Sequence, residues 1–196
     1  MKIGVISVQG AFPEHRVAVE NALRSLGLKG AAVTVRRLPD LEGCEAVIIP
    51  GGESTTISKL LVRFKLHERI VEMAHEGVPV MGTCAGMVLL AKEGDDEVAN
   101  TETKLLGLMD MAVDRNSYGR QRESFEVPLD IEGLDAPFPG IFIRAPIVRR
   151  VWNGCRALST RPEGIVMAGQ GNLTALSFHP ELTKDTRVHE MLLRMV

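Results

Sequence analysis

Short apolar segments alternate with amphipathic ones over the first 91 residues. Continuous apolar runs predict buried strands at Lys2–Val8, Ala31–Arg37, Ala46–Ile49 and Val78–Met81. Apolar positions at helical spacing predict a helix over Pro13–Leu26, a helical region from Ser54 or Thr55 to about Glu76, and a helix after Cys84. Strands that alternate with helices in this way predict a doubly wound α/β fold around a parallel sheet.

The pattern changes after Ala91. The polar and acidic segment Lys92–Thr103 predicts an exposed loop. Further strands are predicted at Phe125–Leu129, Gly140–Ile143, Val148–Val151, Ile165–Gly169 and Leu173–Phe178. Gly171-Asn172 predicts a hairpin turn, and a helix is predicted from about Lys184 to Val196. We therefore expect residues 1–196 to form a single α/β domain, whose mostly parallel central sheet is flanked by helices and extended by antiparallel strands.

Composition excludes several classes of function. The chain is 45% hydrophobic and 24% charged, which is typical of a globular domain, and its net charge of −2 gives no basic excess for binding nucleic acid. No apolar run approaches the ~20 residues that span a membrane, and the N-terminus lacks the layout of a signal peptide. The three cysteines, at unrelated spacings, predict neither a disulfide framework nor a zinc site. We expect a cytoplasmic protein.

Cys84 lies at the corner between a predicted strand and a predicted helix. A lone cysteine is most often a small buried apolar residue. Here Gly82 and Gly86 flank it as Gly-x-Cys-x-Gly, the thiol form of the nucleophile elbow. The two glycines allow a sharp, strained turn that holds the side chain clear of the sheet, at a helix N-terminus that favours a thiolate. This context favours a nucleophile.

A thiol nucleophile needs a base, and the base needs an orienting group. His179 follows the apolar strand that begins at Leu173, at the end where α/β sheets place their sites. Pro180 favours an extended segment, in which His179 and Glu181 face the same side. Their alternative role is a turn that caps the last helix. The remaining histidines are expected at the surface: His15, His67, His75 and His189.

A glycine turn follows the third strand, at residues 50–56 with the sequence Pro-Gly-Gly-Glu-Ser-Thr-Thr. A phosphate loop is one interpretation, but the Gly-Lys-Ser/Thr ending is absent. A structural strand-to-helix turn is the second. The third is a loop that offers backbone N–H groups to a substrate oxygen, and it is favoured because the third and fourth strands are expected to be neighbours.

The chain resembles the class I glutamine amidotransferases, whose signature is a Gly-x-Cys-x-Gly elbow with a later His-x-Glu. Within that family it resembles the glutaminase subunits of two-component pyridoxal 5′-phosphate synthases. Six stretches carry the resemblance in the family's order: residues 9–11, 50–56, 82–86, 115–121, 142–146 and 177–183. The Arg-Asn-Ser-Tyr-Gly-Arg-Gln stretch from Arg115 and the Ile-Arg-Ala-Pro stretch from Ile143 indicate the subfamily.

The resemblance implies hydrolysis of L-glutamine to L-glutamate and ammonia. Cys84 would attack the carboxamide, His179 would move the protons and Glu181 would hold the His179 ring, by way of a glutamyl thioester. Backbone N–H groups of Gly52 and Ala85 would stabilise the oxyanion. The resemblance implies no metal or organic cofactor.

Six residues would bind the glutamine by the same resemblance: Gly52, Glu53, Ser54, Arg115, Ile143 and Arg144. Arginine suits the substrate α-carboxylate and Glu53 suits its ammonium group. The sequence does not distinguish the two arginines, and either also suits a structural ion pair.

The resemblance also implies a partner. The ammonia would pass to a separate synthase subunit in a hetero-oligomeric complex, which builds pyridoxal 5′-phosphate from a pentose phosphate and a triose phosphate. Docking of that subunit would favour the competent orientation of the Gly51–Gly52 peptide. Three alternatives stay open: a glutaminase subunit for a different synthase, a thiol hydrolase similar to γ-glutamyl hydrolases, and a catalytically inactive binding module.

Overall fold

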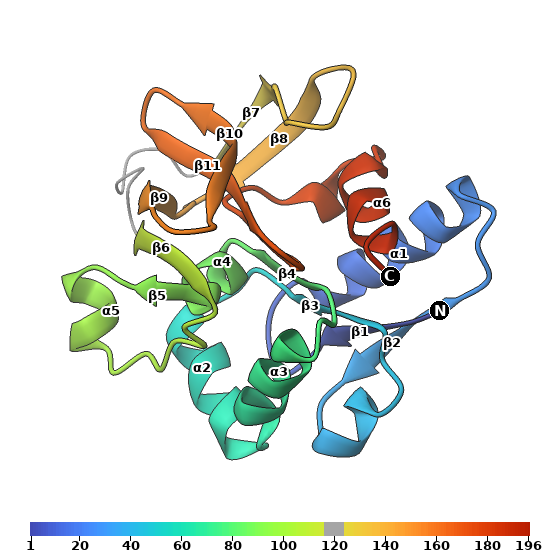
Figure 1. Cartoon of the computed structure of the whole chain (residues 1–196), viewed down its shortest axis with the longest axis horizontal. Helices are drawn as coiled ribbons and strands as arrows, with labels where there is room; N and C mark the ends of the chain where they lie inside the picture. The colour runs from blue at the N-terminus through green and yellow to red at the C-terminus, as the bar shows by residue number, and fades with distance from the viewer. Residues whose placement is uncertain (116–123) are drawn as a thin grey trace.

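The computed structural model describes residues 1–115 and 124–196 (Figure 1). Its largest element is a sheet whose order is β2-β1-β3-β4-β12-β11-β9-β6-β5, with β10 paired to β11. The strands are β1 Lys2–Ile6, β2 Ala31–Val35, β3 Ala46–Ile49, β4 Val80–Thr83, β5 Ala91–Glu93, β6 Met109–Asp114, β9 Ile147–Val151, β10 Arg156–Arg161, β11 Gly164–Gln170 and β12 Leu173–Leu176. Strands β2, β1, β3, β4 and β12 are parallel neighbours, and β11 pairs with β12, β9 and β10 in antiparallel register.

Helices cover both faces of the parallel strands. They are α1 Phe12–Ser25, α2 Ser54–Arg63, α3 Leu66–His75, α4 Ala85–Leu90, α5 Asp96–Asn100 and α6 Arg187–Leu193, with short 3-10 turns η1 Leu38–Leu41 and η2 Pro180–Leu182. Helices α2, α3 and α4 enclose one core cluster with the sheet, and α1 and α6 enclose the other. Figure 1 shows α1 and α6 side by side, although they come from opposite ends of the chain.

Strand β3 illustrates why these runs are continuously apolar. Val47 and Ile49 point into the core under α2, α3 and α4, whereas Ala46 and Ile48 point into the core under α1 and α6. Successive side chains of a strand face opposite sides, so a strand covered on both faces must be apolar at every position. The predicted mostly parallel α/β fold with added antiparallel strands is therefore confirmed.

Two local predictions were wrong, and three strands were missed. The segment Lys92–Thr103 is not simply a loop: it contains the end of β5 and α5, where the Asp95 carboxylate accepts the Val98 N–H at 3.0 Å and the Val98 side chain is buried. Strands β5, β6 and β10 were not predicted. Helix α2 is capped by Glu53, not by Ser54 or Thr55.

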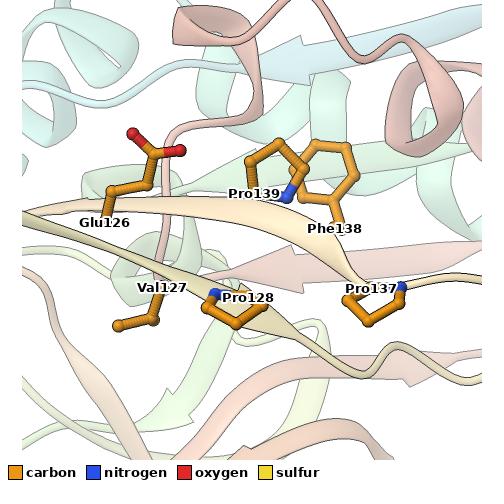
Figure 2. Close-up of a pocket in the computed structure, with 6 residues that line it drawn as sticks. All are labelled: Glu126, Val127, Pro128, Pro137, Phe138 and Pro139. Carbon is orange, nitrogen blue, oxygen red and sulfur yellow. The ribbon is translucent and has the colours of Figure 1, made fainter.

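A second, two-stranded sheet pairs β7 Ser124–Leu129 with β8 Phe138–Ile143 in antiparallel register. A hollow of about 380 Å³ lies against this ribbon, lined by Glu126, Val127, Pro128, Pro137, Phe138 and Pro139. Figure 2 shows Glu126 and Val127 on opposite sides of the ribbon, as successive strand residues must be. Within residues 1–115 and 124–196, no helix has the length and apolar character needed to cross a bilayer.

Candidate active site

The candidate site lies where neighbouring parallel strands end. Strands β1, β3, β4 and β12 are adjacent in the sheet, and their carboxyl ends lead to Gln9, Gly51, Cys84 and His179 respectively. Residues from four distant parts of the sequence therefore meet at one edge, the usual location of binding sites in open α/β sheets.

Cys84 occupies a strained corner between β4 and α4. Its backbone has φ 49° and ψ −104°, a conformation that costs on the order of 1–3 kcal/mol for a residue other than glycine. A Cβ on Gly82 would lie 2.5 Å from the Gly86 carbonyl oxygen, and a Cβ on Gly86 would overlap the carbonyl oxygen of Ile49. The two flanking glycines are thus required by the packing of the turn, as the sequence predicts.

The other two cysteines lie in less reactive surroundings. Burial raises the pKa of the Cys44 thiol, and burial together with the Asp110 charge raises the pKa of Cys155 to about 11. A high pKa leaves little thiolate at neutral pH, so neither side chain has the character of a nucleophile. Cys84 differs in having a histidine beside it.

His179 and Glu181 form a hydrogen-bonded pair beside Cys84. Their Nδ1 and Oε1 atoms lie 2.7 Å apart, and both side chains are buried. Burial disfavours the charged ring, but hydrogen bonding to Cys84 and to Glu181 outweighs it and raises the pKa of His179 to about 10. The predicted extended segment is instead the single 3-10 turn η2, which starts at Pro180 and still brings the carboxylate to the ring.

Two histidines that were expected at the surface lie behind this pair. His15 of α1 and His189 of α6 are fully buried, with His15 Nδ1 3.1 Å from His189 Nε2. His15 Nε2 lies 3.0 Å from Thr83 Oγ1 and 3.3 Å from Glu181 Oε2. His67 is also buried, with its Nε2 3.0 Å from the Leu105 carbonyl oxygen, so the surface prediction holds for His75 alone. The sequence gives no sign of these burials because they arise from packing between distant elements.

The glycine turn after β3 is held by the loop after β1. The Ala11 N–H donates to the Gly51 carbonyl oxygen at 3.1 Å, and the Glu53 N–H donates to Gln9 Oε1 at 3.0 Å. A Cβ on Gly51 would lie 2.6 Å from His179 Cε1, so this backbone packs directly on the histidine ring. The Gln9-Gly10-Ala11 stretch thus fixes the turn, a role that the sequence alone did not reveal.

Glu53 and Arg115 are paired with each other. Arg115 donates to Glu53 Oε1 at 2.5 Å, while the Glu53 carboxylate also accepts the N–H groups of Thr55 and Thr56 at 3.0 and 2.6 Å. Burial opposes the charged carboxylate, but these hydrogen bonds, led by the Thr56 hydroxyl, and the Arg115 charge lower the pKa of Glu53 to about 2. Glu53 is therefore a fixed anion that caps α2 beside the site.

A cavity of about 360 Å³ opens above Cys84. It is lined by Gly52, Glu53, Ser54, Cys84, Ala85, Val88, Glu97, Arg115, Arg144 and Pro146. Most of the predicted substrate-binding residues line it. Ile143 is not among them, but its carbonyl oxygen lies 3.9 Å from Cys84 Sγ. Residues 116–121 of the stretch that follows Arg115 lie outside the described residues.

Two polar groups of the cavity have no protein partner within the described part of the chain. The buried Ser54 hydroxyl has no hydrogen bond, and no ion pair or hydrogen bond involves the Arg144 guanidinium. Arg144 also has φ 44°, a strained conformation of the kind that clusters at ligand sites. Among residues 1–115 and 124–196, no group of three or more acidic, histidine or cysteine side chains is arranged to hold a metal ion.

Comparison with known proteins gives concordant matches. The model of the SNO glutamine amidotransferase family matches residues 5–196. The chain is 50% identical over 196 residues to pyridoxal 5′-phosphate synthase subunit PdxT of Methanosarcina acetivorans, covering 100% of this chain and 98% of the relative. It is also 50% identical over 195 residues to PdxT of Archaeoglobus fulgidus, covering 100% and 98%. A crystal structure of a glutamine amidotransferase matches with a TM-score of 0.87 at 43% identity, covering 98% of this chain and 97% of that chain.

Proposed function

Because the chain belongs to the SNO glutamine amidotransferase family, we propose that it hydrolyses L-glutamine through Cys84, His179 and Glu181. The predicted resemblance to glutaminase subunits of pyridoxal 5′-phosphate synthase is confirmed by the relatives. The observation that carries the proposed chemistry is that Cys84, which lines the cavity, lies beside the buried His179–Glu181 pair.

The first half of the reaction forms the thioester. The Cys84 thiolate attacks the side-chain amide carbon of glutamine, and the carbonyl oxygen becomes an oxyanion. His179, kept protonated by its raised pKa, gives its proton to the departing nitrogen, which leaves as ammonia. Glu181 accepts the Nδ1 hydrogen bond at 2.7 Å, which fixes the tautomer and stabilises the imidazolium.

The second half consumes one water molecule. Neutral His179 takes a proton from water, and the resulting hydroxide attacks the thioester carbon. The carbon–sulfur bond breaks, glutamate leaves and the Cys84 thiolate is restored beside the imidazolium. The cycle returns every group to its starting protonation state.

Backbone N–H groups of Gly52 and Ala85 would stabilise the oxyanion. Ala85 is the first residue of α4, where an N–H has no acceptor within the helix. The Gly52 N–H belongs to the peptide whose carbonyl oxygen, that of Gly51, accepts the Ala11 N–H at 3.1 Å. Both donors thus belong to the turns that flank the thiol.

The cavity suits the two charged groups at the α-carbon of glutamine. Arg144 is our candidate for the α-carboxylate, because its guanidinium is unpaired among the described residues, whereas Arg115 is held by Glu53. The Glu53 carboxylate would contact the α-ammonium, and the Ser54 hydroxyl gains its missing partner from the ligand. Ile143 would act through its carbonyl oxygen.

We further propose that the ammonia goes to the synthase subunit that builds pyridoxal 5′-phosphate, in a hetero-oligomeric complex in the cytoplasm. The names of the relatives support this partner, and the three free thiols suit a reducing compartment. Docking would favour the Gly51–Gly52 orientation that serves the oxyanion, so activity should depend on the partner.

Ammonia release from glutamine, measured with and without a candidate synthase subunit, tests this proposal. We expect weak activity alone and a large rise with the partner, because one oxyanion donor is worth about 10²–10³ in rate. Gly52→Ala, whose Cβ would overlap Gln9 Oε1, should blunt that rise more than it weakens binding in a parallel titration. Faster cleavage of γ-glutamyl peptides than of glutamine, or no ammonia release even with the partner, would contradict the proposal.

A further inference from the structure

A buried chain of polar side chains continues beyond Glu181 into the core. Glu181 Oε1 bonds to His179, while Oε2 lies 3.3 Å from His15 Nε2 and has no hydrogen-bond partner among residues 1–115 and 124–196. The Glu181 and His15 side chains are completely buried. A carboxylate oxygen enclosed in this way favours a donor nearby. His15 Nε2 is a polar atom in contact with it, although its hydrogen bond in this structure is to Thr83 Oγ1, at 3.0 Å.

The donor and acceptor roles in this chain follow from the contacts. If His15 carries its proton on Nδ1, the Nε2 lone pair faces the Glu181 carboxylate. The His15 Nδ1–H then donates to His189 Nε2, so His189 must carry its own proton on Nδ1. That buried N–H has no partner in the described chain. If His15 carries its proton on Nε2, that N–H faces Glu181 and Thr83 Oγ1, and the His189 Nε2–H donates to His15 Nδ1. The second arrangement leaves only an acceptor lone pair unpaired, on His189 Nδ1, and orphaned buried N–H donors are the rarer case.

We propose that His15 is a positioning residue of the active site, whose Nε2–H holds the second oxygen of Glu181 while His189 fixes the His15 tautomer. This inference rests on the proposed hydrolysis through Cys84, His179 and Glu181. Helices α1 and α6 thereby take part in orienting the His179 ring, although neither helix contributes a residue that lines the cavity above Cys84.

The charges of the cluster agree with this arrangement. Burial, followed by the charges of His189 and His179, holds the pKa of His15 well below its ordinary value, and burial lowers the pKa of His189 to about 4. Both rings are therefore neutral at physiological pH and do not compete with His179 for the single negative charge of Glu181. His15 places an N–H beside Glu181 without supplying a charge, which leaves the carboxylate free to stabilise the His179 imidazolium.

Two isosteric substitutions separate a donor role from a packing role. The side-chain amide nitrogen of glutamine reproduces the His15 Nε2 donor, whereas the amide of asparagine reaches only the Nδ1 position. His15→Asn should lower kcat by about 10- to 100-fold with a smaller change in KM, the effect expected for removing a donor that faces a charged group. His15→Gln should retain most of kcat. His67→Gln is the matched control, because His67 is a buried histidine bonded to the Leu105 carbonyl oxygen, away from the cavity.

A second readout does not depend on glutamine. Alkylation of Cys84 by iodoacetamide, followed against pH in the isolated chain, reports how the thiol is coupled to His179. The alkylation profile should move in His15→Asn and stay in place in His15→Gln and His67→Gln. If no variant hydrolyses glutamine while the alkylation profile moves as expected, the proposed function fails and the positioning role stands.

A third measurement needs no substitution and removes the risk that His15→Asn fails to fold. Nitrogen-15 chemical shifts of histidine-labelled wild-type chain distinguish the two tautomers of a neutral ring. We expect His15 protonated on Nε2 and unprotonated on Nδ1. A proton on Nδ1 would overturn the inference, and so would a folded His15→Asn chain with wild-type kcat and alkylation profile, or equal losses in His15→Gln and His15→Asn.

Discussion

Gly51→Ala is the substitution whose effect on catalysis follows most directly from the structure. The added Cβ would lie 2.6 Å from His179 Cε1, 3.2 Å from its Nδ1 and 3.3 Å from Cys84 Cβ. Ordinary contact begins at 3.4 Å, so the ring and the Gly51 backbone must separate by about 0.8 Å. The buried ring is held by Glu181 at 2.7 Å, so it cannot move away without tilting.

A misplacement of about 1 Å at a reacting group is enough to cost on the order of 10²-fold in rate. We therefore expect Gly51→Ala to lower kcat for ammonia release about 10²-fold. The fold should persist, because Gly51 does not have a positive φ, and alanine at a compatible position lowers the entropy of the unfolded chain.

The assay is steady-state ammonia release in the presence of the synthase subunit, with thermal unfolding measured alongside. Gly154→Ala is the matched control, since a Cβ there meets no atom within 4 Å and its φ is not positive. Wild-type turnover in a folded Gly51→Ala chain, equal to that of Gly154→Ala, would refute the packing of this turn on the catalytic histidine.

Three further outcomes are expected. His179→Asn should abolish ammonia release. Glu181→Gln should lower kcat by about 10- to 150-fold, as expected for weakening one hydrogen bond to a charged group. Equal kcat in Glu181→Gln and wild type would exclude the orienting role of Glu181. Because His179 must be protonated to release ammonia, kcat should be constant at neutral pH and fall as pH rises through about 10. In Glu181→Gln the fall should come at lower pH. An unchanged pH profile in Glu181→Gln would show that Glu181 does not raise the pKa of His179. Arg144→Met should raise KM for glutamine more than it lowers kcat, and an effect confined to Arg115→Met would assign the α-carboxylate to that arginine instead.

The parts of the site that the sequence predicts are those carried by short-range patterns. Cys84 was predicted because two glycines flank it within two residues along the chain. The structure shows why both are needed, since a Cβ on either would clash with nearby backbone atoms. His179 and Glu181 were predicted because a histidine at a strand end, with a carboxylate two residues later, is a local arrangement. The neighbouring positions of β3 and β4 follow from the alternation of strands and helices.

Long-range packing accounts for what the sequence did not predict. Strand β12 joins the parallel set beside β4, and this places His179 against Cys84, but no local pattern fixes that strand order. The burial of His15 and His189 depends on the contact between α1 and α6, which lie far apart in the sequence. Strand β10 carries polar residues with little apolar periodicity, and its pairing with β11 defines it.

Covalent capture of the nucleophile tests the central claim most directly. The chain, with the synthase subunit present, is incubated with a glutamine analogue that carries an electrophile at the amide carbon, and the modified peptide is identified by mass spectrometry. The account predicts one adduct, on Cys84, formed in parallel with the loss of ammonia release and absent from a folded Cys84→Ala chain that releases no ammonia. An adduct on Cys44 or Cys155, or ammonia release at the wild-type rate by Cys84→Ala, would contradict it.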